Sequence, residues 1–133
     1  MDFKHRLELK VRDYECDIQG VVNNSVYQQY LEHARHEFLL ASGIVFAALA
    51  EQKINLVVVR AELDYKQSLR PGDKFWVGTR LERSSRIRFN FIQGIYRQTD
   101  DALMLQGKIT GTSLNERGRP FLPDVILGLI ESA

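Results

Sequence analysis

Apolar and charged side chains alternate regularly over residues 6–12. Leu7, Leu9 and Val11 are separated by arginine, glutamate and lysine residues, so the three apolar side chains would face the same way. A period of two is typical of a β-strand with one buried face. We therefore expect the chain to begin with a half-buried strand.

The period changes after residue 23, where apolar side chains recur at spacings of three and four. This spacing places them on one face of an amphipathic helix. Asparagine and serine residues at 23–25 are favourable N-caps, and Gly43 is a favourable residue just beyond a helix end. We predict a long helix from about Ser25 to Ala41 and a short one within 44–52. The apolar face of the long helix comprises Val26, Tyr30, Ala34, Phe38 and Ala41.

Four later segments are rich in β-branched or aromatic residues and are predicted to be strands. They cover 54–65, 74–82, 86–98 and 103–114, with turn-forming residues at 70–73, 83–85, 99–101 and 115–120. Residues 123–132 are predicted to form a short terminal helix. The order of elements predicts an α+β fold, in which a five-stranded antiparallel sheet wraps around one long central helix.

Nothing in the chain resembles a linker, a repeat or a low-complexity segment, and 133 residues suit one domain. We therefore expect a single domain over 1–133. A curved sheet with one helix leaves an exposed edge strand, which small domains often protect by association. We expect a homodimer or homotetramer whose sheets join edge to edge.

The composition argues against several classes of protein. The chain has 18 Lys and Arg against 17 Asp and Glu, so its net charge of +1 gives no overall attraction for nucleic acid or an anionic membrane. A single cysteine, Cys16, excludes an internal disulfide. The most apolar stretch, 38–50, is too short for a membrane span, and no signal peptide is evident. We expect a soluble, cytoplasmic protein.

The polar loop before the long helix is the strongest candidate for a chemical site. Asp17 precedes the expected helix start at Asn24, where free backbone N–H groups and the helix dipole stabilise negative charge. A carboxylate there can act as nucleophile or general base while the N–H groups polarise a carbonyl. Alternatively, Asp13, Glu15 and Asp17 only shape the loop and complement the dipole.

The segment from Asp17 to Tyr27 resembles the signature of the hot-dog-fold acyl thioesterases of the 4-hydroxybenzoyl-CoA thioesterase type. That signature is D-x-x-G-h-h-x-x-x-x-Y leading into a long helix, and Asp17, Gly20 and Tyr27 stand at its fixed positions. Residues 58–65 and 69–73 are similar to the second strand and turn of the same family. More narrowly, 8–15, 20–24 and 35–37 resemble the acyl-lipid and methylketone-synthase thioesterases of plants.

The resemblance implies a hot-dog fold and the hydrolysis of acyl-CoA or acyl-carrier-protein thioesters to a free acid and a thiol, without a cofactor. Asp17 matches the catalytic carboxylate, which attacks the thioester or activates water. Asn24 matches the position whose backbone N–H serves the oxyanion hole, and Gly20 is the fixed glycine of the loop. Some relatives carry histidine at the position of Asn24 or Val21, so a mechanism needing an imidazole there is not implied.

Candidates for substrate binding follow from the same resemblance. An acyl chain would lie in an apolar tunnel beside the helix, although residues of this kind also form ordinary core. The apolar candidates are Tyr27, Tyr30, Leu31 and Val58. Arg86 and Arg88 belong to the one basic cluster and match the side of the family fold where CoA or carrier phosphates dock. The alternative is a charged hairpin rim.

Other functions stay open at this point. A non-catalytic module that binds acyl thioesters or a partner would share the fold. A hot-dog dehydratase would need a histidine working with a carboxylate, and the three histidines are poorly placed for that.

His33 and His36 lie one turn apart, but without a third ligand they define no metal site. Glu32 and Arg35 lie one helical turn apart, so they can pair on the helix surface or, alternatively, support Asp17 from the helix. Arginines interleaved with aromatic residues at 83–96 can bind single-stranded nucleic acid, which the net charge argues against.

Overall fold

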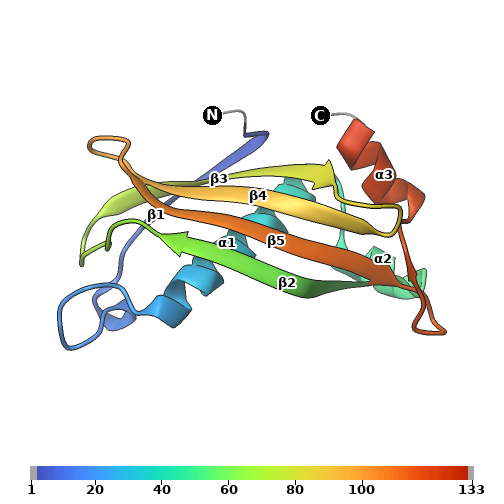
Figure 1. Ribbon diagram of the computed structural model, residues 1–133, viewed down its shortest axis with the longest axis horizontal. Coiled ribbons are helices and arrows are strands. Elements are labelled where there is room, and N and C mark those ends of the chain that lie inside the picture. The colour runs from blue at the N-terminus through green and yellow to red at the C-terminus, as the bar shows by residue number, and fades with distance from the viewer. Residues whose placement is uncertain (1–2, 132–133) are drawn as a thin grey trace.

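A computed structural model describes residues 3–131, which form one antiparallel sheet with a long helix behind it (Figure 1). The strands are β1 (His5–Lys10), β2 (Asn55–Tyr65), β3 (Lys74–Arg83), β4 (Arg88–Arg97), β5 (Leu103–Leu114) and β6 (Pro120–Phe121). The helices are a short 3-10 helix (Asp13–Glu15), α1 (Asn24–Ala41), α2 (Phe46–Glu51) and α3 (Asp124–Glu131).

The order of strands across the sheet is β1-β3-β4-β5-β2, with β6 beside β5. Strands β3, β4 and β5 form a meander, while both edge strands come from earlier in the chain. The predicted α+β fold with five antiparallel strands around one long helix is confirmed. The two-residue strand β6 is an addition, because Pro120 and Phe121 pair with the end of β5 where a turn alone was expected.

Helix α1 begins at Asn24 because Asn23 caps it. The side chain of Asn23 accepts a hydrogen bond from the backbone N–H of Ser25 at 3.0 Å. The chain leaves the helix through Gly43, whose φ of +86° favours glycine. The buried face comprises Tyr27, Tyr30, Leu31, Ala34, Phe38 and Leu39. The predicted face is confirmed from Val26, which is half-buried and packs against the core, to Phe38, and it was wrong at Ala41, which is exposed.

An aromatic cluster occupies the face of the sheet opposite α1. The rings of Trp76 and Tyr96 stack at 4.4 Å, and the ring of Phe3 packs edge-on against both. The cross-strand pair Gly78 and Gly94 makes room for Phe3, because a Cβ on Gly78 would collide with its ring and one on Gly94 would crowd it. The first residues of the described chain are thereby fixed to the sheet.

Strand β2 forms an edge of the sheet. It pairs with β5 from Asn55 to Tyr65, and the register shifts between Val58 and Arg60. Its burial is low along most of its length, and Val58 and Val59 are 55% and 44% exposed. Among residues 3–131, no helix is both long and apolar enough to cross a membrane.

Candidate functional site

The loop between the 3-10 helix and α1 presents Asp17 to solvent. The backbone N–H of Asp17 donates to the carbonyl of Val21 at 2.9 Å, and that of Gly20 donates to the carbonyl of Asp17 at 3.0 Å. Gly20 has a φ of +75°, which explains a glycine at this position. The exposed carboxylate of Asp17 accepts the N–H of Gln19 at 2.9 Å. The loop therefore holds a carboxylate in place while leaving it accessible.

Buried Glu15 ties this loop to α1. Its Oε1 accepts the backbone N–H of Arg12 and the hydroxyl of Tyr30, both at 2.8 Å. Its carbonyl accepts the N–H of Asn23 at 3.0 Å. Burial and the hydrogen bond to Glu15 raise the pKa of Tyr30, which keeps its hydroxyl protonated as a donor. Glu15 thus has the structural role that the sequence analysis left open for it.

The first turn of α1 supplies hydrogen-bond donors at the same end of the molecule as the Asp17 loop (Figure 1). The N-cap side chain of Asn23 accepts the backbone N–H of Ser25. In the described part of the chain, the backbone N–H of Asn24 therefore has no acceptor. Together with the positive end of the helix dipole, a free amide suits a developing oxyanion. Carboxylate and amide come from one short segment, 17–24.

The predicted substrate-binding tyrosines lie in the core. Tyr27 is 2% exposed and its hydroxyl accepts the N–H of Leu69 at 2.9 Å; burial raises its pKa. Tyr30 is 6% exposed, and its ring packs on Phe75 at 4.7 Å while its hydroxyl binds Glu15. Both residues support the loop and helix, and neither lines the groove described next.

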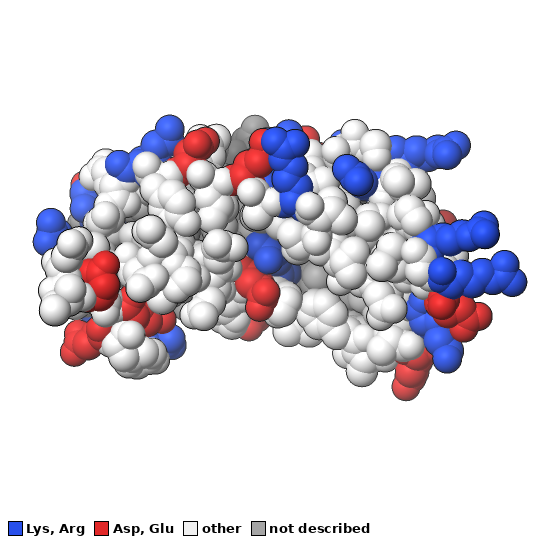
Figure 2. Space-filling view, turned by 60° about the horizontal axis from the view of Figure 1, so that its bottom comes forward, with Lys and Arg blue, Asp and Glu red and all other residues white. Residues whose placement is uncertain are grey.

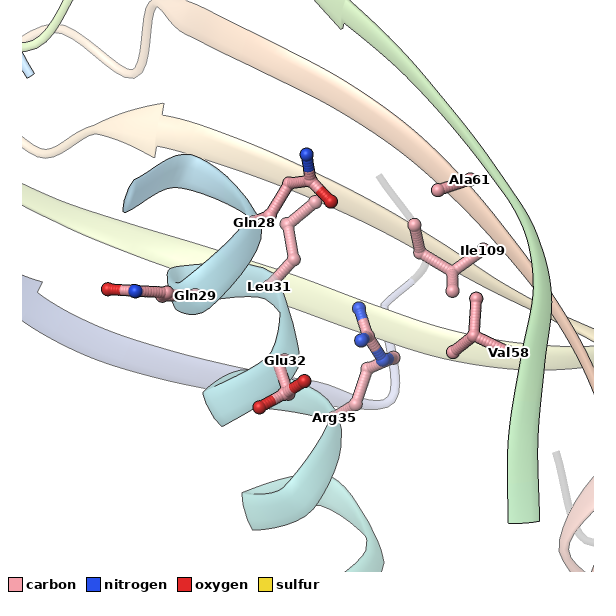
Figure 3. A pocket seen from close by; sticks show the side chains of 8 residues that line it. All are labelled: Gln28, Gln29, Leu31, Glu32, Arg35, Val58, Ala61 and Ile109. Atoms are coloured by element: carbon pink, nitrogen blue, oxygen red, sulfur yellow. The ribbon is translucent and has the colours of Figure 1, made fainter. Parts of the chain in front are cut away.

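A groove of about 250 Å³ lies between α1 and strands β2 and β5 (Figure 3). Leu31 of α1 and Val58 of β2, two of the residues predicted to bind substrate, are among those that line it. A second hollow of about 170 Å³ continues it toward α2 and shares four residues with it. The shared residues are Glu32, Arg35, Val58 and Ile109. The two hollows follow α1 from Gln28 onward.

Among residues 3–131, Glu32 and Arg35 do not form the surface ion pair that their spacing allows. Within the described residues, Arg35 instead donates to Gln93 Oε1 at 3.2 Å and faces the groove. The signal in the sequence was the position of Arg35, next to Ala34 on the buried stripe of the helix. Its partner lies on β4, which no local pattern relates to the helix.

Arg86 and Arg88 lie at the turn from β3 to β4, at the opposite end of the sheet from Asp17 (Figure 1). Arg88 pairs with Thr112 near one end of β5. The other end of β5 pairs with Tyr65, whose hydroxyl lies 3.5 Å from the carbonyl of Asn24 at the start of α1. Several Lys and Arg side chains project from one end of the face seen in Figure 2. Within one chain, the structure does not bring these arginines to the loop.

Two other kinds of site, a metal centre and a reactive thiol at Cys16, are not supported by residues 3–131. No group of three His, Cys, Asp or Glu side chains there could hold a metal ion. Burial and then the nearby carboxylates of Asp13, Glu15 and Asp17 raise the pKa of the Cys16 thiol. A raised pKa disfavours the reactive thiolate, which supports a structural role for Cys16.

Comparison with known proteins shows the family of the chain. Residues 11–129 match the model of the thioesterase-like superfamily. The chain is 39% and 38% identical over 116 residues to two chloroplastic acyl-acyl carrier protein thioesterases of Arabidopsis thaliana, ATL3 and ATL2. The match covers 87% of this chain but 61% and 62% of those proteins, so the chain spans about three fifths of their length.

Two solved structures show the same fold. A 1,4-dihydroxy-2-naphthoyl-CoA thioesterase from Synechocystis has a TM-score of 0.86 and 20% identity, over 94% of this chain and 93% of that one. A hypothetical protein from Aquifex aeolicus has a TM-score of 0.86 and 28% identity, over 95% of this chain and 98% of that one. These likenesses confirm the predicted hot-dog fold.

Proposed function

The chain belongs to the thioesterase-like superfamily, and on that premise we propose that it is a hydrolase of acyl thioesters carried on CoA or an acyl carrier protein. The observation that carries the proposal is the exposed carboxylate of Asp17, held by a glycine-closed loop that leads directly to the free backbone N–H of Asn24 at the start of α1. The plant relatives are described as acyl-acyl carrier protein thioesterases, which makes carrier-bound chains the first substrates to test.

In this mechanism Asp17 acts on the thioester carbonyl carbon, either directly as a nucleophile or by deprotonating a water molecule that attacks it. The carbonyl oxygen becomes an oxyanion, which the backbone N–H of Asn24 and the helix dipole stabilise. Losing one such donor costs about 100-fold to 1000-fold in rate. When Asp17 is the nucleophile, breaking the carbon–sulfur bond leaves an anhydride between the acyl group and Asp17, which a water molecule then hydrolyses. When Asp17 is the base, the attacking water displaces the thiolate directly. In both cases the thiolate takes up a proton, and one water molecule is consumed to give a free acid and a thiol.

The groove along α1 is the proposed site for the acyl chain. Leu31 and Val58 supply apolar surface on its two sides, and it begins within two turns of Asn24. Burying the methylene groups of a chain there would contribute about 0.8 kcal/mol each. Tyr27 and Tyr30 would act indirectly, by fixing the helix that carries both the groove and the oxyanion donor.

We further propose that two chains pair through β2. This strand is an edge with exposed valines, and its antiparallel pairing with a second copy would extend the sheet. The β3–β4 turn of one copy would then lie on the same side as the Asp17 loop of the other. Arg86 and Arg88 would serve phosphate binding only in this arrangement, across the dimer.

The test compares the wild type with Asp17→Asn on a panel of acyl-CoA and acyl-carrier-protein thioesters. Product acids are measured by mass spectrometry, because Cys16 would react with thiol dyes. We expect kcat to fall about 100-fold to 10,000-fold, with unchanged unfolding, because Asn keeps the acceptor for Gln19. Asp13→Asn is the matched control, because Asp13 is an exposed carboxylate on the 3-10 helix that precedes the loop.

The outcome separates the two functional candidates. Full activity of a folded Asp17→Asn protein would remove Asp17 from the mechanism. Tight binding of the thioesters without turnover by the wild type would instead support a non-catalytic acyl-binding module on the same fold.

A further inference from the structure

A guanidinium group lies in the middle of the groove along α1. Arg35 extends from the helix into the space in front of β2 and lines both hollows (Figure 3). The side chains facing it from the strands are the hydrocarbons of Val58, Ala61 and Ile109. Burial lowers the pKa of Arg35, and the charge of Glu32 acts in the opposite direction. In this position the guanidinium loses part of the hydration that an arginine on the surface would keep, which is unfavourable in free energy.

A buried hydrogen-bond network fixes this guanidinium. Its Nη1 donates to Gln93 Oε1 at 3.2 Å. Gln93 is fully buried on β4, and its Nε2 donates to the carbonyl of Leu31 at 3.0 Å and to Thr79 Oγ1 at 3.1 Å. Both donors of the amide are thus used by α1 and β3, so its oxygen is held toward Arg35.

Most of the donors of Arg35 are left for a ligand. A guanidinium has five N–H groups, and within residues 3–131 only Gln93 accepts from it. The same range contains no ion pair of Arg35, although Glu32 lines the groove one helical turn away. The groove therefore offers hydrogen-bond donors on Arg35 and an acceptor on Glu32 among apolar walls.

We propose that Arg35 and Glu32 form a binding site for a hydroxyl group on the distal part of the acyl chain. A hydroxyl accepts from the guanidinium and donates to the carboxylate, whereas a carboxylate ligand would be repelled by Glu32. Arg35 follows Asn24 by eleven residues, or roughly 16 Å along the helix. The recognised oxygen is therefore far from the thioester. This inference rests on the proposed thioesterase function.

The test uses pairs of acyl-CoA thioesters of equal length, one saturated and one carrying an ω-hydroxyl, over a series of lengths. We expect kcat/KM of the wild type to favour the hydroxylated chain about 10-fold at the lengths that reach Arg35, as a hydrogen bond to a charged group allows. In Arg35→Met the ratio of the two kcat/KM values should fall to about one, whatever the change in absolute rate.

Two further variants separate recognition from folding. Arg35→Lys keeps a donor for Gln93 but loses the fork of five N–H groups, so it should fold and still lose most of the preference. Arg80→Met removes an arginine of β3 that lies outside the groove and pairs with Glu82, and it should keep the wild-type ratio. A wild type without preference at any length, or an unchanged ratio in Arg35→Met, would overturn the inference.

The failure of this inference can be told from a failure of the proposed function. If no thioester is hydrolysed, the thioesterase proposal fails. The hydroxyl site at Arg35 is then tested by comparing the dissociation constants of the saturated and ω-hydroxylated CoA thioesters of each pair. An affinity ratio near one in the wild type would overturn the hydroxyl site independently of catalysis.

Discussion

The hydroxyl of Tyr30 and the carboxylate of Glu15 meet at 2.8 Å inside the protein, fifteen residues apart in the chain. One belongs to α1 and the other to the 3-10 helix two residues before Asp17. The carbonyl of Glu15 also binds the N–H of the N-cap residue Asn23. The loop that carries Asp17 and helix α1 are therefore joined into one unit.

Tyr30→Phe tests this joint. The change leaves the ring in place but removes the donor to a buried carboxylate, so we expect the free energy of unfolding to fall by about 1–3 kcal/mol. We also expect kcat to fall, because the loop loses its tie to α1. Urea unfolding and steady-state kinetics measure both effects. Tyr14→Phe is the control, since Tyr14 precedes Glu15 on the 3-10 helix and is 80% exposed. Equal stability of Tyr30→Phe and wild type would contradict the prediction.

Val59→Lys tests pairing through β2. A charge on an exposed edge strand opposes edge-to-edge association, so the variant should sediment as a monomer while the wild type sediments as a dimer. Val125→Lys is the matched control, because Val125 is similarly exposed but lies on α3. A dimer that survives Val59→Lys would place the interface elsewhere.

Gly78→Ala tests the aromatic cluster on the outer face of the sheet. The new methyl group would collide with the ring of Phe3, and overpacking of this kind costs about 1–3 kcal/mol. The double variant with Phe3→Ala should be no less stable than Phe3→Ala alone, since the two changes act on one contact. Gly128→Ala in α3 meets open space and should stabilise the protein by about 0.5–1 kcal/mol. Additive losses would show that Phe3 does not occupy this site.

Asp100→Asn tests the electrostatics of the β4–β5 turn. Two hydrogen bonds from Arg97, at 3.0 and 2.6 Å, lower the pKa of Asp100 from 3.8 to about 2. A carboxyl whose pKa is lower in the folded state stabilises the fold above its unfolded pKa, and this contribution disappears as the pH falls toward 2. The variant should therefore have a slightly lower Tm than wild type at neutral pH, and the difference should shrink as the pH falls from about 4 through about 2. A constant difference across this range would contradict the prediction.

The sequence predicted those features that depend on neighbours in the chain. Alternation around Leu7 and Leu9 predicts β1, and the favourable N-cap residues at 23–25 predict the start of α1 to within one residue, because both follow from local geometry. The pairing of Arg35 with Gln93 joins residues 58 positions apart, so it depends on how the sheet crosses the helix. The position of Arg86 relative to Asp17 depends in the same way on strand order, which no residue pattern specifies.

The connectivity of the sheet also has a consequence for the order of folding. Strands β3, β4 and β5 are joined by short turns, whereas β1 reaches β3 only by closing the long stretch between the register partners Lys10 and Lys74. Loop closure over a longer stretch costs more entropy, so the meander should form first and the two outer strands last. In native-state hydrogen exchange, β4 would then be protected longest, and the amides of β2 would open before the rest. The strand proposed to meet a second copy would thus be among the last parts to fold, so that dimerisation and the completion of folding would be coupled.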